Sequence, residues 1–238
     1  MSSSASSTFK VAVSEQAAVT VKAAVPSGLR TDTPALILAH GANNDLDHPL
    51  LAYLADHLVD MTGVLVVRFN FPYVERGVTS PDPRGLLEDT FRRVHDHAVD
   101  ELCGPGAPIF LGGKSLGGRV AAELVSRGRE AEGLLVAGLV VLGYPLHAPG
   151  RQDRLHVEPL RRIGVPSLFF LGTRDPFCDL ELFRPIVAGL SHPGELHVIE
   201  GGDHSLRLPS SSKRQPEDGY GEVARKIAGF IEEVTGAI

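Results

Sequence analysis

The sequence predicts an α/β fold with a mostly parallel central sheet and helices on both of its faces. Short, continuous apolar runs recur along the 238 residues, and such runs are typical of strands that are covered on both sides. Between these runs lie segments in which apolar residues recur every three or four positions, as on one face of a helix. An alternation of strand and helix favours parallel strands joined by helical crossovers.

Eight segments have the composition of strands. They are residues 9–13, 18–24, 34–39, 64–69, 109–111, 133–144, 165–171 and 195–199. The first two alternate apolar and polar side chains, which predicts an antiparallel pair at one edge of the sheet. Most of the others are continuous apolar runs and are expected to be buried strands.

Five segments carry helix signals. The first helix is predicted to begin at Pro49 and to end before Gly63. Residues 70–83 are expected to be a loop whose last two residues, Asp82 and Pro83, cap and begin the second helix. The others are the segment after Ser115 and residues 180–190 and 220–234.

The composition is that of an ordinary globular protein, with 43% hydrophobic and 22% charged residues and a formal net charge of −6. No basic cluster stands out, which argues against nucleic acid or an anionic membrane as a partner. The N-terminus lacks the basic start and apolar core of a signal peptide, so we expect a cytoplasmic protein. We expect residues 1–8 to be a disordered tail and residues 9–238 to form one domain. The spacing of Cys103 and Cys178 argues against a disulfide framework and against a cysteine zinc site.

A glycine-rich turn joins one of the predicted strands to the helix that follows it. After the apolar run at 109–111 the chain reads Gly112-Gly113-Lys114-Ser115-Leu116-Gly117-Gly118-Arg119. The flanks of such an abrupt turn crowd together, so that only glycine fits two positions before and two positions after the central serine. A G-x-S-x-G turn of this kind lifts the Ser115 hydroxyl above the sheet edge and points the first amides of the helix at whatever the hydroxyl attacks.

Gly113-Lys114-Ser115 also matches the end of the phosphate-binding motif G-x-x-x-x-G-K-[ST]. That motif requires glycine five residues before Gly113, where this chain has Pro108, and it requires a loop between the strand and the lysine. We therefore prefer the interpretation of Ser115 as a nucleophile. A glycine-rich turn that contains a serine by chance is the other alternative.

Three polar residues that follow predicted strands are candidates for catalysis. A serine hydroxyl needs a base within hydrogen-bond reach, and the base needs a group that fixes its tautomer. Ser115, Asp175 and His204 occur in the order serine, acid, histidine that accompanies G-x-S-x-G turns. Because the C-terminal ends of parallel strands meet at one edge of a sheet, we expect these side chains to converge. Asp179 and Asp203 are alternatives for the acid, and a helix N-cap is the alternative role for Asp175.

Two backbone amides are candidates for an oxyanion hole, the donors that would hold a negatively charged substrate oxygen. One is the amide of Leu116, directly after the serine, and the other is that of Ala42, in the loop after residues 34–39. His40 is expected to brace this loop. Possible substrate contacts at the same sheet edge are His40, Asn43, Arg76 and His147, with a solvated surface role as the alternative for the last two. No metal and no cofactor is implied.

Six motifs spread over the chain carry a resemblance to a known family. They are Leu38-Ala39-His40-Gly41-Ala42, Arg68-Phe69-Asn70-Phe71-Pro72, the glycine-rich turn around Ser115, Gly143-Tyr144-Pro145-Leu146-His147, Gly172-Thr173-Arg174-Asp175-Pro176-Phe177-Cys178 and Gly202-Asp203-His204-Ser205. Together they resemble the alpha/beta-hydrolase family that includes a testis-expressed hydrolase-like protein and a regulatory subunit of the NSL histone acetyltransferase complex. The chain is also similar, more distantly, to dienelactone hydrolases, which carry cysteine where this chain has Ser115. The resemblance covers nearly the whole chain after residue 30, and it implies the alpha/beta-hydrolase fold with Ser115, Asp175 and His204 as triad positions.

The residues and the resemblance together predict an enzyme of the serine hydrolase class. We expect it to cleave a carboxylic ester or thioester of a small-molecule acyl substrate through an acyl-enzyme on Ser115. The polar segment from Pro145 to Arg162 is too short to form a large lid, which predicts an open site. The alternative is a non-catalytic binding or scaffold protein that keeps the fold and an inert triad.

Overall fold

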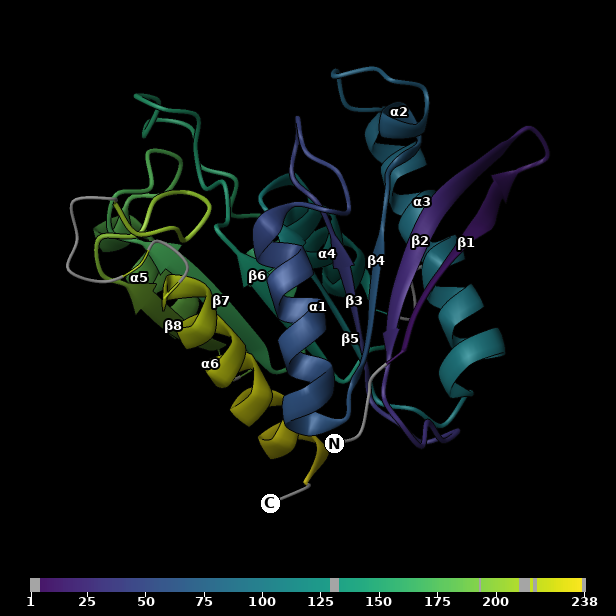
Figure 1. Cartoon of the computed structure of the whole chain (residues 1–238). Helices are drawn as coiled ribbons and strands as arrows, with labels where there is room; N and C mark the ends of the chain where they lie inside the picture. Colours follow the sequence, from purple (N-terminus) through teal and green to yellow (C-terminus); the bar gives the residue numbers. More distant parts are fainter. Residues whose placement is uncertain (1–4, 129–132, 193, 210–214, 216–217, 237–238) are drawn as a thin grey trace.

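The computed structural model describes residues 5–128, 133–192, 194–209, 215 and 218–236, and its centre is one eight-stranded sheet. The strands follow the spatial order β1-β2-β4-β3-β5-β6-β7-β8 (Figure 1). Their bounds are β1 Ala5–Ser14, β2 Ala17–Val25, β3 Ala35–Ala39, β4 Leu65–Phe69, β5 Ile109–Lys114, β6 Gly138–Leu142, β7 Ser167–Gly172 and β8 Gly194–Ile199. β2 pairs antiparallel with β1 and with β4, whereas all the other neighbours pair in parallel. The prediction of a mostly parallel sheet with an antiparallel pair at one edge is confirmed.

Helices cover both faces of the sheet (Figure 1). Their bounds are α1 Pro49–Thr62, α2 Pro72–Glu75, α3 Arg84–His97, α4 Leu116–Arg127, α5 Leu180–Ala188 and α6 Asp218–Thr235. α1 and α6 lie side by side on one face, and α3, α4 and α5 pack against the other. α1 ends where the sequence indicated, because Gly63 adopts a φ of 68° and its amide donates to the Val59 carbonyl. Among the described residues, no helix combines the length and the hydropathy needed to cross a membrane.

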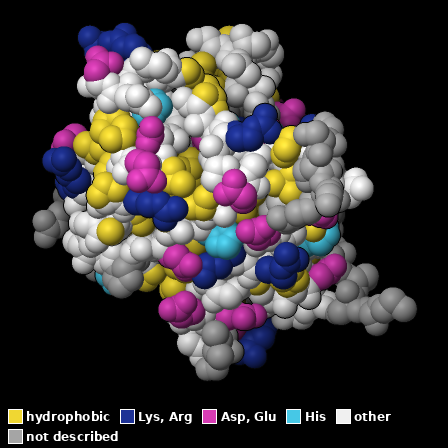
Figure 2. All heavy atoms as spheres, turned by 90° about the vertical axis from the view of Figure 1, so that its left-hand side faces the viewer, with side chains coloured by type: hydrophobic (Ala, Val, Ile, Leu, Met, Phe, Trp, Pro, Cys, Tyr) yellow, Lys and Arg dark blue, Asp and Glu magenta, His cyan; other side chains and the backbone are white. Residues whose placement is uncertain are grey.

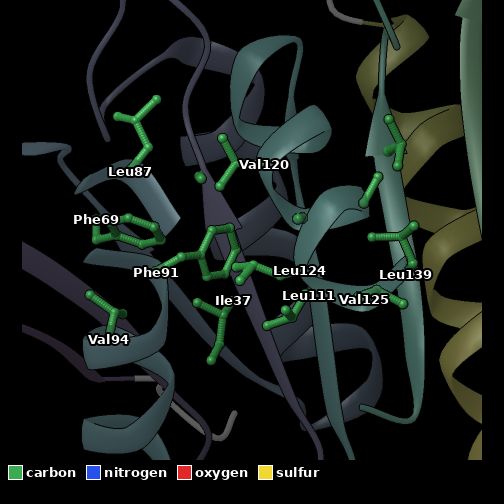
Figure 3. Close-up of a cluster of buried hydrophobic side chains, with 14 of the residues drawn as sticks. Ile37, Phe69, Leu87, Phe91, Val94, Leu111, Val120, Leu124, Val125 and Leu139 are labelled. Carbon is green, nitrogen blue, oxygen red and sulfur yellow. The ribbon is translucent and has the colours of Figure 1, made fainter. Parts of the chain in front are cut away.

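Each face of the sheet buries its own hydrophobic cluster. Along β3 the side chains alternate, so that Leu36 and Leu38 join the cluster facing α1 and α6, while Ile37 joins the cluster facing α3 and α4. Figure 3 shows the second cluster, with Ile37 among side chains from both of these helices. Phe69 and Phe91 meet there edge to face, with ring centroids 5.0 Å apart. This cover on both sides explains why β3 reads as an unbroken apolar run.

Three segments differ from the elements expected from the sequence. The first strand begins at Ala5, so residues 5–8, which we expected in a disordered tail, pair with β2; residues 1–4 lie outside the described residues. The expected loop at 70–83 contains the short helix α2. The strand expected over 133–144 is limited to β6. The serine-rich composition of residues 5–8 gave no sign of a strand, because the hydrogen bonds that form it come from a partner segment.

Asp82 does not cap the helix that follows it, so that prediction was wrong. α3 has Pro83 at its N-cap position, and no side chain caps it. The Asp82 carboxylate instead accepts a hydrogen bond of 2.8 Å from the Tyr73 amide and pairs with the Arg76 guanidinium. Asp82 therefore holds the connection between α2 and α3 together.

The last strand, β8, forms the other edge of the sheet, close to α5 and α6. Figure 2 shows this side of the molecule, on which Lys and Arg side chains lie interspersed with Asp and Glu. Around β8, Lys226 pairs with Glu195 at 2.6 Å, and His197 hydrogen-bonds to Glu222 at 2.9 Å. Charged side chains beside an edge strand hinder its pairing with a strand of another molecule.

Glu75 in α2 ties the antiparallel edge of the sheet to the loop after β4. Its carboxylate accepts hydrogen bonds from the Lys10 ammonium, the Thr20 amide and the Asn70 side chain. Burial alone would raise the pKa of Glu75, but these hydrogen bonds outweigh it and lower the pKa from 4.5 to about 2. Asn70 in turn accepts from the Leu46 amide, so the tie extends to the loop that precedes α1.

Glu75→Gln is expected to lower the free energy of unfolding by at most about 3 kcal/mol at neutral pH. Because the pKa of Glu75 is lower in the folded than in the unfolded chain, its contribution is present above pH 4.5 and is lost as the pH falls toward 2. Urea denaturation of wild type and variant should show a difference at neutral pH that narrows below pH 4.5. Glu15→Gln, in the exposed turn between β1 and β2, is the matched control and should leave stability unchanged. A difference that does not depend on pH would contradict this account.

Candidate active site

Ser115 is the single residue between the end of β5 and the start of α4. Its φ of 51° and ψ of −112° lie in a region that non-glycine residues rarely adopt, at a cost of about 1–3 kcal/mol. The Ser115 amide donates to the Leu142 carbonyl at 3.0 Å, and the Ser115 carbonyl accepts from the Arg119 amide at 2.9 Å. The neighbouring strand and the new helix therefore hold the serine in a strained turn at the C-terminal edge of the sheet.

Close backbone contacts require glycine on both sides of this turn. A Cβ at Gly117 would lie 2.3 Å from the Ala39 carbonyl oxygen, and a Cβ at Gly113 would lie 2.6 Å from the same oxygen. Both distances are far below van der Waals contact, so any side chain would push the end of β3 away from the turn. The loop of residues 40–43 begins at that point, and the turn and the loop are therefore packed directly against each other.

His204 joins Ser115 to Asp175 through hydrogen bonds at both of its ring nitrogens. Nε2 lies 2.9 Å from Ser115 Oγ, and Nδ1 lies 2.7 Å from Asp175 Oδ2. Because an ionised carboxylate only accepts hydrogen bonds, Nδ1 carries the proton that is donated to Asp175. Nε2 is left to accept from the serine hydroxyl, which is the tautomer that a general base requires.

Asp175 is the acid that reaches His204, and the two alternative aspartates make other contacts. The Asp175 side chain has no exposed surface, and its second oxygen accepts from the Phe177 amide at 2.8 Å. Asp179 accepts from two amides in the first turn of α5 and is the N-cap of that helix. Asp203 accepts from two amides of its own loop. The helix-capping role considered for Asp175 thus belongs to Asp179.

The loop after β3 runs directly beside Ser115. A Cβ at Gly41 would lie 3.3 Å from Ser115 Cβ, and Ala42 is the next residue. Leu116 is the first residue of α4, so its amide has no partner within the helix. In the described part of the chain, neither the Ala42 nor the Leu116 amide donates a hydrogen bond. Two unused amides next to a serine hydroxyl are the donors that an oxyanion needs.

His40 braces this loop and does not face a substrate. The ring is fully buried, its Nε2 accepts from the Phe71 amide at 3.1 Å, and its Nδ1 lies 2.8 Å from the Gly41 carbonyl oxygen. The proton is therefore on Nδ1. Burial lowers the pKa of His40, which keeps the ring neutral. The geometry agrees with the bracing role expected from the sequence and contradicts a substrate contact.

His147 is also a loop-holding residue, so its expected substrate contact was wrong. The side chain is buried, and its Nε2 accepts from the Asp179 amide at 3.2 Å. Its Nδ1 lies 2.9 Å from the Ala148 carbonyl oxygen. Nε2 therefore joins the segment after β6 to the segment before α5, and Nδ1 fixes the ring to its own segment.

Of the remaining expected contacts, Asn43 borders open space and Arg76 is held in an ion pair. Asn43 adopts a φ of 57° and lines a cavity of about 260 Å³ together with Tyr73 and Val78. The Arg76 guanidinium is bound by the Asp82 carboxylate and stabilises the loop after α2. Asn43 is therefore the better placed of the two for a substrate.

Three residues at the site were missed by the sequence reasoning. Gly143 has a φ of 70°, and a Cβ there would lie 2.8 Å from the His204 carbonyl oxygen and 3.3 Å from Nδ1. The Phe177 ring centroid lies 4.5 Å from that of His204. Lys114 is buried directly before Ser115. Gly143 directly follows a strand, and Lys114 is the charged residue just before Ser115 in the glycine-rich turn. Both features could have been noticed in the sequence.

Cysteine chemistry is not supported at this site. Cys103 and Cys178 are free, buried thiols, and burial raises the pKa of both. A thiol with a raised pKa is a poor nucleophile and a poor metal ligand. Among the described residues, no group of three or more His, Cys, Asp or Glu side chains is arranged to hold a metal ion.

Comparison with known proteins agrees with this fold. A family model described as alpha/beta hydrolase domain matches residues 32–232. The structure is similar to a dienelactone hydrolase from Anabaena variabilis, with a TM-score of 0.73 and 16% identity over 97% of this chain and 98% of that chain. It is also similar to Est1E from Butyrivibrio proteoclasticus (TM-score 0.72, 14% identity, 96% and 99% covered) and to a serine hydrolase without lid from Xanthomonas campestris (TM-score 0.65, 16% identity, 98% and 94% covered). These identities are low, and the structural likeness shows the fold alone. The family match spans most of the sequence, and the chain therefore belongs to the alpha/beta hydrolase domain family.

Proposed function

We propose that this chain is a serine hydrolase that cleaves a carboxylic ester or thioester through an acyl-enzyme on Ser115. The observation that supports this most directly is the hydrogen-bonded path from Ser115 Oγ through both nitrogens of His204 to the buried Asp175. A serine hydroxyl becomes a strong nucleophile when a base takes its proton as it attacks. His204 is placed to take that proton, and Asp175 is placed to stabilise the imidazolium that forms.

The first half of the proposed reaction forms the acyl-enzyme. Ser115 Oγ attacks the substrate carbonyl carbon while its proton passes to His204 Nε2. The carbonyl oxygen becomes an oxyanion that the amides of Leu116 and Ala42 stabilise. When the tetrahedral intermediate collapses, the bond to the alcohol or thiol breaks, and the leaving group takes the proton from His204.

The second half releases the acid and restores the serine. A water molecule gives a proton to His204 Nε2 and attacks the acyl carbon, and the same two amides hold the second oxyanion. The bond to Ser115 Oγ then breaks, and the proton returns from His204 to the serine oxygen. Ser115 and His204 are both restored at the end. The net reaction consumes one water molecule and releases the acid and the alcohol or thiol.

The proposal of an ester or thioester as the substrate class rests on the leaving group. An alkoxide or thiolate leaves with less help from a general acid than an amine does. Between β6 and β7 the structure has only a short 3₁₀ turn, Leu160–Arg162, among the described residues of that segment.

Labelling with a fluorophosphonate probe tests this proposal. We expect the folded protein to be labelled and the label to be found on Ser115 by peptide mass spectrometry, because the probe reacts with activated serines. Heat-denatured protein is the control and should remain unlabelled, since unfolding separates Ser115 from His204. A folded protein that takes no label would favour the alternative, a non-catalytic binding or scaffold protein with this fold. A panel of acyl esters of varied chain length would then define the preferred acyl group.

Several narrower expectations stay predictions. They are a small-molecule acyl substrate with neither nucleic acid nor membrane as a partner, a cytoplasmic location, and the organisation of the chain as a single domain. The closer resemblance to the testis-expressed and NSL-complex family also rests on sequence motifs alone.

A further inference from the structure

Lys114 is a buried lysine that directly precedes the proposed nucleophile in the chain. It is the last residue of β5, and only 5% of its surface is exposed. Burying an ammonium is costly unless other groups compensate its charge. Within the described part of the chain, Lys114 Nζ makes no hydrogen bond, although the atom keeps some contact with solvent. An apolar side chain would avoid this cost, so the presence of a charged residue here needs a functional explanation.

The Lys114 ammonium group lies close to Gly41, in the loop that follows β3. The point that a Cβ on Gly41 would occupy lies 3.6 Å from Lys114 Nζ and 3.3 Å from Ser115 Cβ. Gly41 immediately precedes Ala42, whose amide is one of the two proposed oxyanion donors. The ammonium therefore lies beside Gly41, and Gly41 in turn lies beside the Ser115 side chain.

The charged and titratable groups around Lys114 come from four segments. Burial lowers the pKa of Lys114, and Asp175 and Asp203, from the loops after β7 and β8, oppose this effect. Burial, and next the Lys114 charge, lower the pKa of His48 at the start of α1 to about 4, so this ring is neutral. His40, at the end of β3, is neutral through burial. Lys114 is thus a cation with two carboxylates near it, Asp175 in the loop after β7 and Asp203 in the loop after β8.

We propose that Lys114 is an electrostatic positioning residue whose fixed positive charge stabilises the negative oxygen that forms when Ser115 attacks. This inference rests on the proposed function, and Lys114 acts through space without touching the substrate. The substrate carbonyl is neutral before attack and carries a full negative charge in the tetrahedral intermediate, so the attraction is stronger for the transition state than for the bound substrate. Lys114 should therefore raise kcat and leave KM nearly unchanged.

Lys114→Met keeps an unbranched side chain that is one atom shorter and removes the charge. We expect kcat for a short-chain p-nitrophenyl ester to fall by roughly 10- to 100-fold, with KM changed by less than about twofold. Lys114→Arg keeps the charge and should retain most of kcat. Lys226→Met, at the far edge of the sheet in an ion pair with Glu195, is the matched control and should behave as wild type.

The alkaline limb of the pH profile separates a charge effect from a packing effect. Because burial lowers the pKa of Lys114, the wild type should lose kcat at a pH below that at which an ordinary lysine titrates. Neither variant should show this decline, since methionine does not titrate and arginine remains charged. Tyr73, beside the same loop, does not account for such a decline, because burial raises its pKa to about 12. Thermal melting at each pH confirms that the proteins compared are folded.

Each outcome decides the proposal. A Lys114→Met variant with the kcat of wild type, or an alkaline decline that persists in either variant, would overturn it. If one variant fails to fold, the pH profile of the other still decides. A wild type that neither labels at Ser115 nor hydrolyses esters overturns the proposed function together with this inference, whereas an active wild type matched by Lys114→Met overturns the role of Lys114 alone.

Discussion

Replacing Ser115 with alanine is expected to lower kcat for ester hydrolysis by about 10⁴- to 10⁶-fold. The substitution removes the nucleophilic oxygen, whose hydroxyl donates to His204 Nε2 at 2.9 Å. Alanine has the same Cβ as serine and accepts the same backbone conformation, so the fold should be preserved. The residual rate should be that of water attack assisted by the oxyanion amides alone.

A matched serine control separates the loss of the nucleophile from the loss of any buried hydroxyl. Ser126 lies on α4, is buried, and donates to the Glu123 carbonyl at 2.8 Å. Ser126→Ala should lose that hydrogen bond, about 1 kcal/mol of stability, and no activity. Equal ester hydrolysis by wild type and Ser115→Ala, both shown to be folded by circular dichroism, would remove the main support for a serine hydrolase.

Asp175→Asn is expected to lower kcat by about 10⁴-fold with little effect on KM. An asparagine NH₂ group turned toward His204 would donate to Nδ1, which forces the ring proton onto Nε2. In that tautomer His204 cannot take the proton of Ser115. Steady-state kinetics with a p-nitrophenyl ester measures the effect, and the melting temperature shows whether the buried site tolerates the amide.

Asp179→Asn is the control for the identity of the acid. Asp179 is four residues further along the chain, and its carboxylate caps α5 without reaching His204. Asparagine is also a good N-cap, so both stability and kcat should stay close to those of wild type. A large loss of kcat in Asp179→Asn together with a small one in Asp175→Asn would show that the acid has been assigned to the wrong residue.

The sequence predicted the roles of some residues at the site and not those of others. The turn at Ser115 was recognisable because its glycines are required by crowding between near neighbours along the chain and the end of β3. His40 was expected to brace its loop, and both ring nitrogens do so. The role of His147 was misjudged, since its position after a strand does not reveal that its ring joins two loops.

Other misjudged segments share the same cause. Asp82 before Pro83 has the sequence signature of a helix cap. Its carboxylate instead binds the Tyr73 amide and the Arg76 guanidinium, and no amide of α3. Residues 5–8 are polar and serine-rich, yet pairing with β2 orders them. In both places a partner distant in sequence outweighs the local preference.

By itself the sequence determined the alternation of strand and helix, the two-sided burial of the central strands and the turn that presents Ser115. The first two features depend on periodicity along the chain, and the turn is recognisable from its glycines, although the close contact that requires them comes partly from the end of β3. Only the tertiary structure decided that Asp175, of three candidate aspartates, faces His204, and that the Lys114 ammonium lies beside Gly41. The hydrogen bonds of His204 join residues 29 and 89 positions apart, and contacts over such separations are set by how the loops pack at the sheet edge.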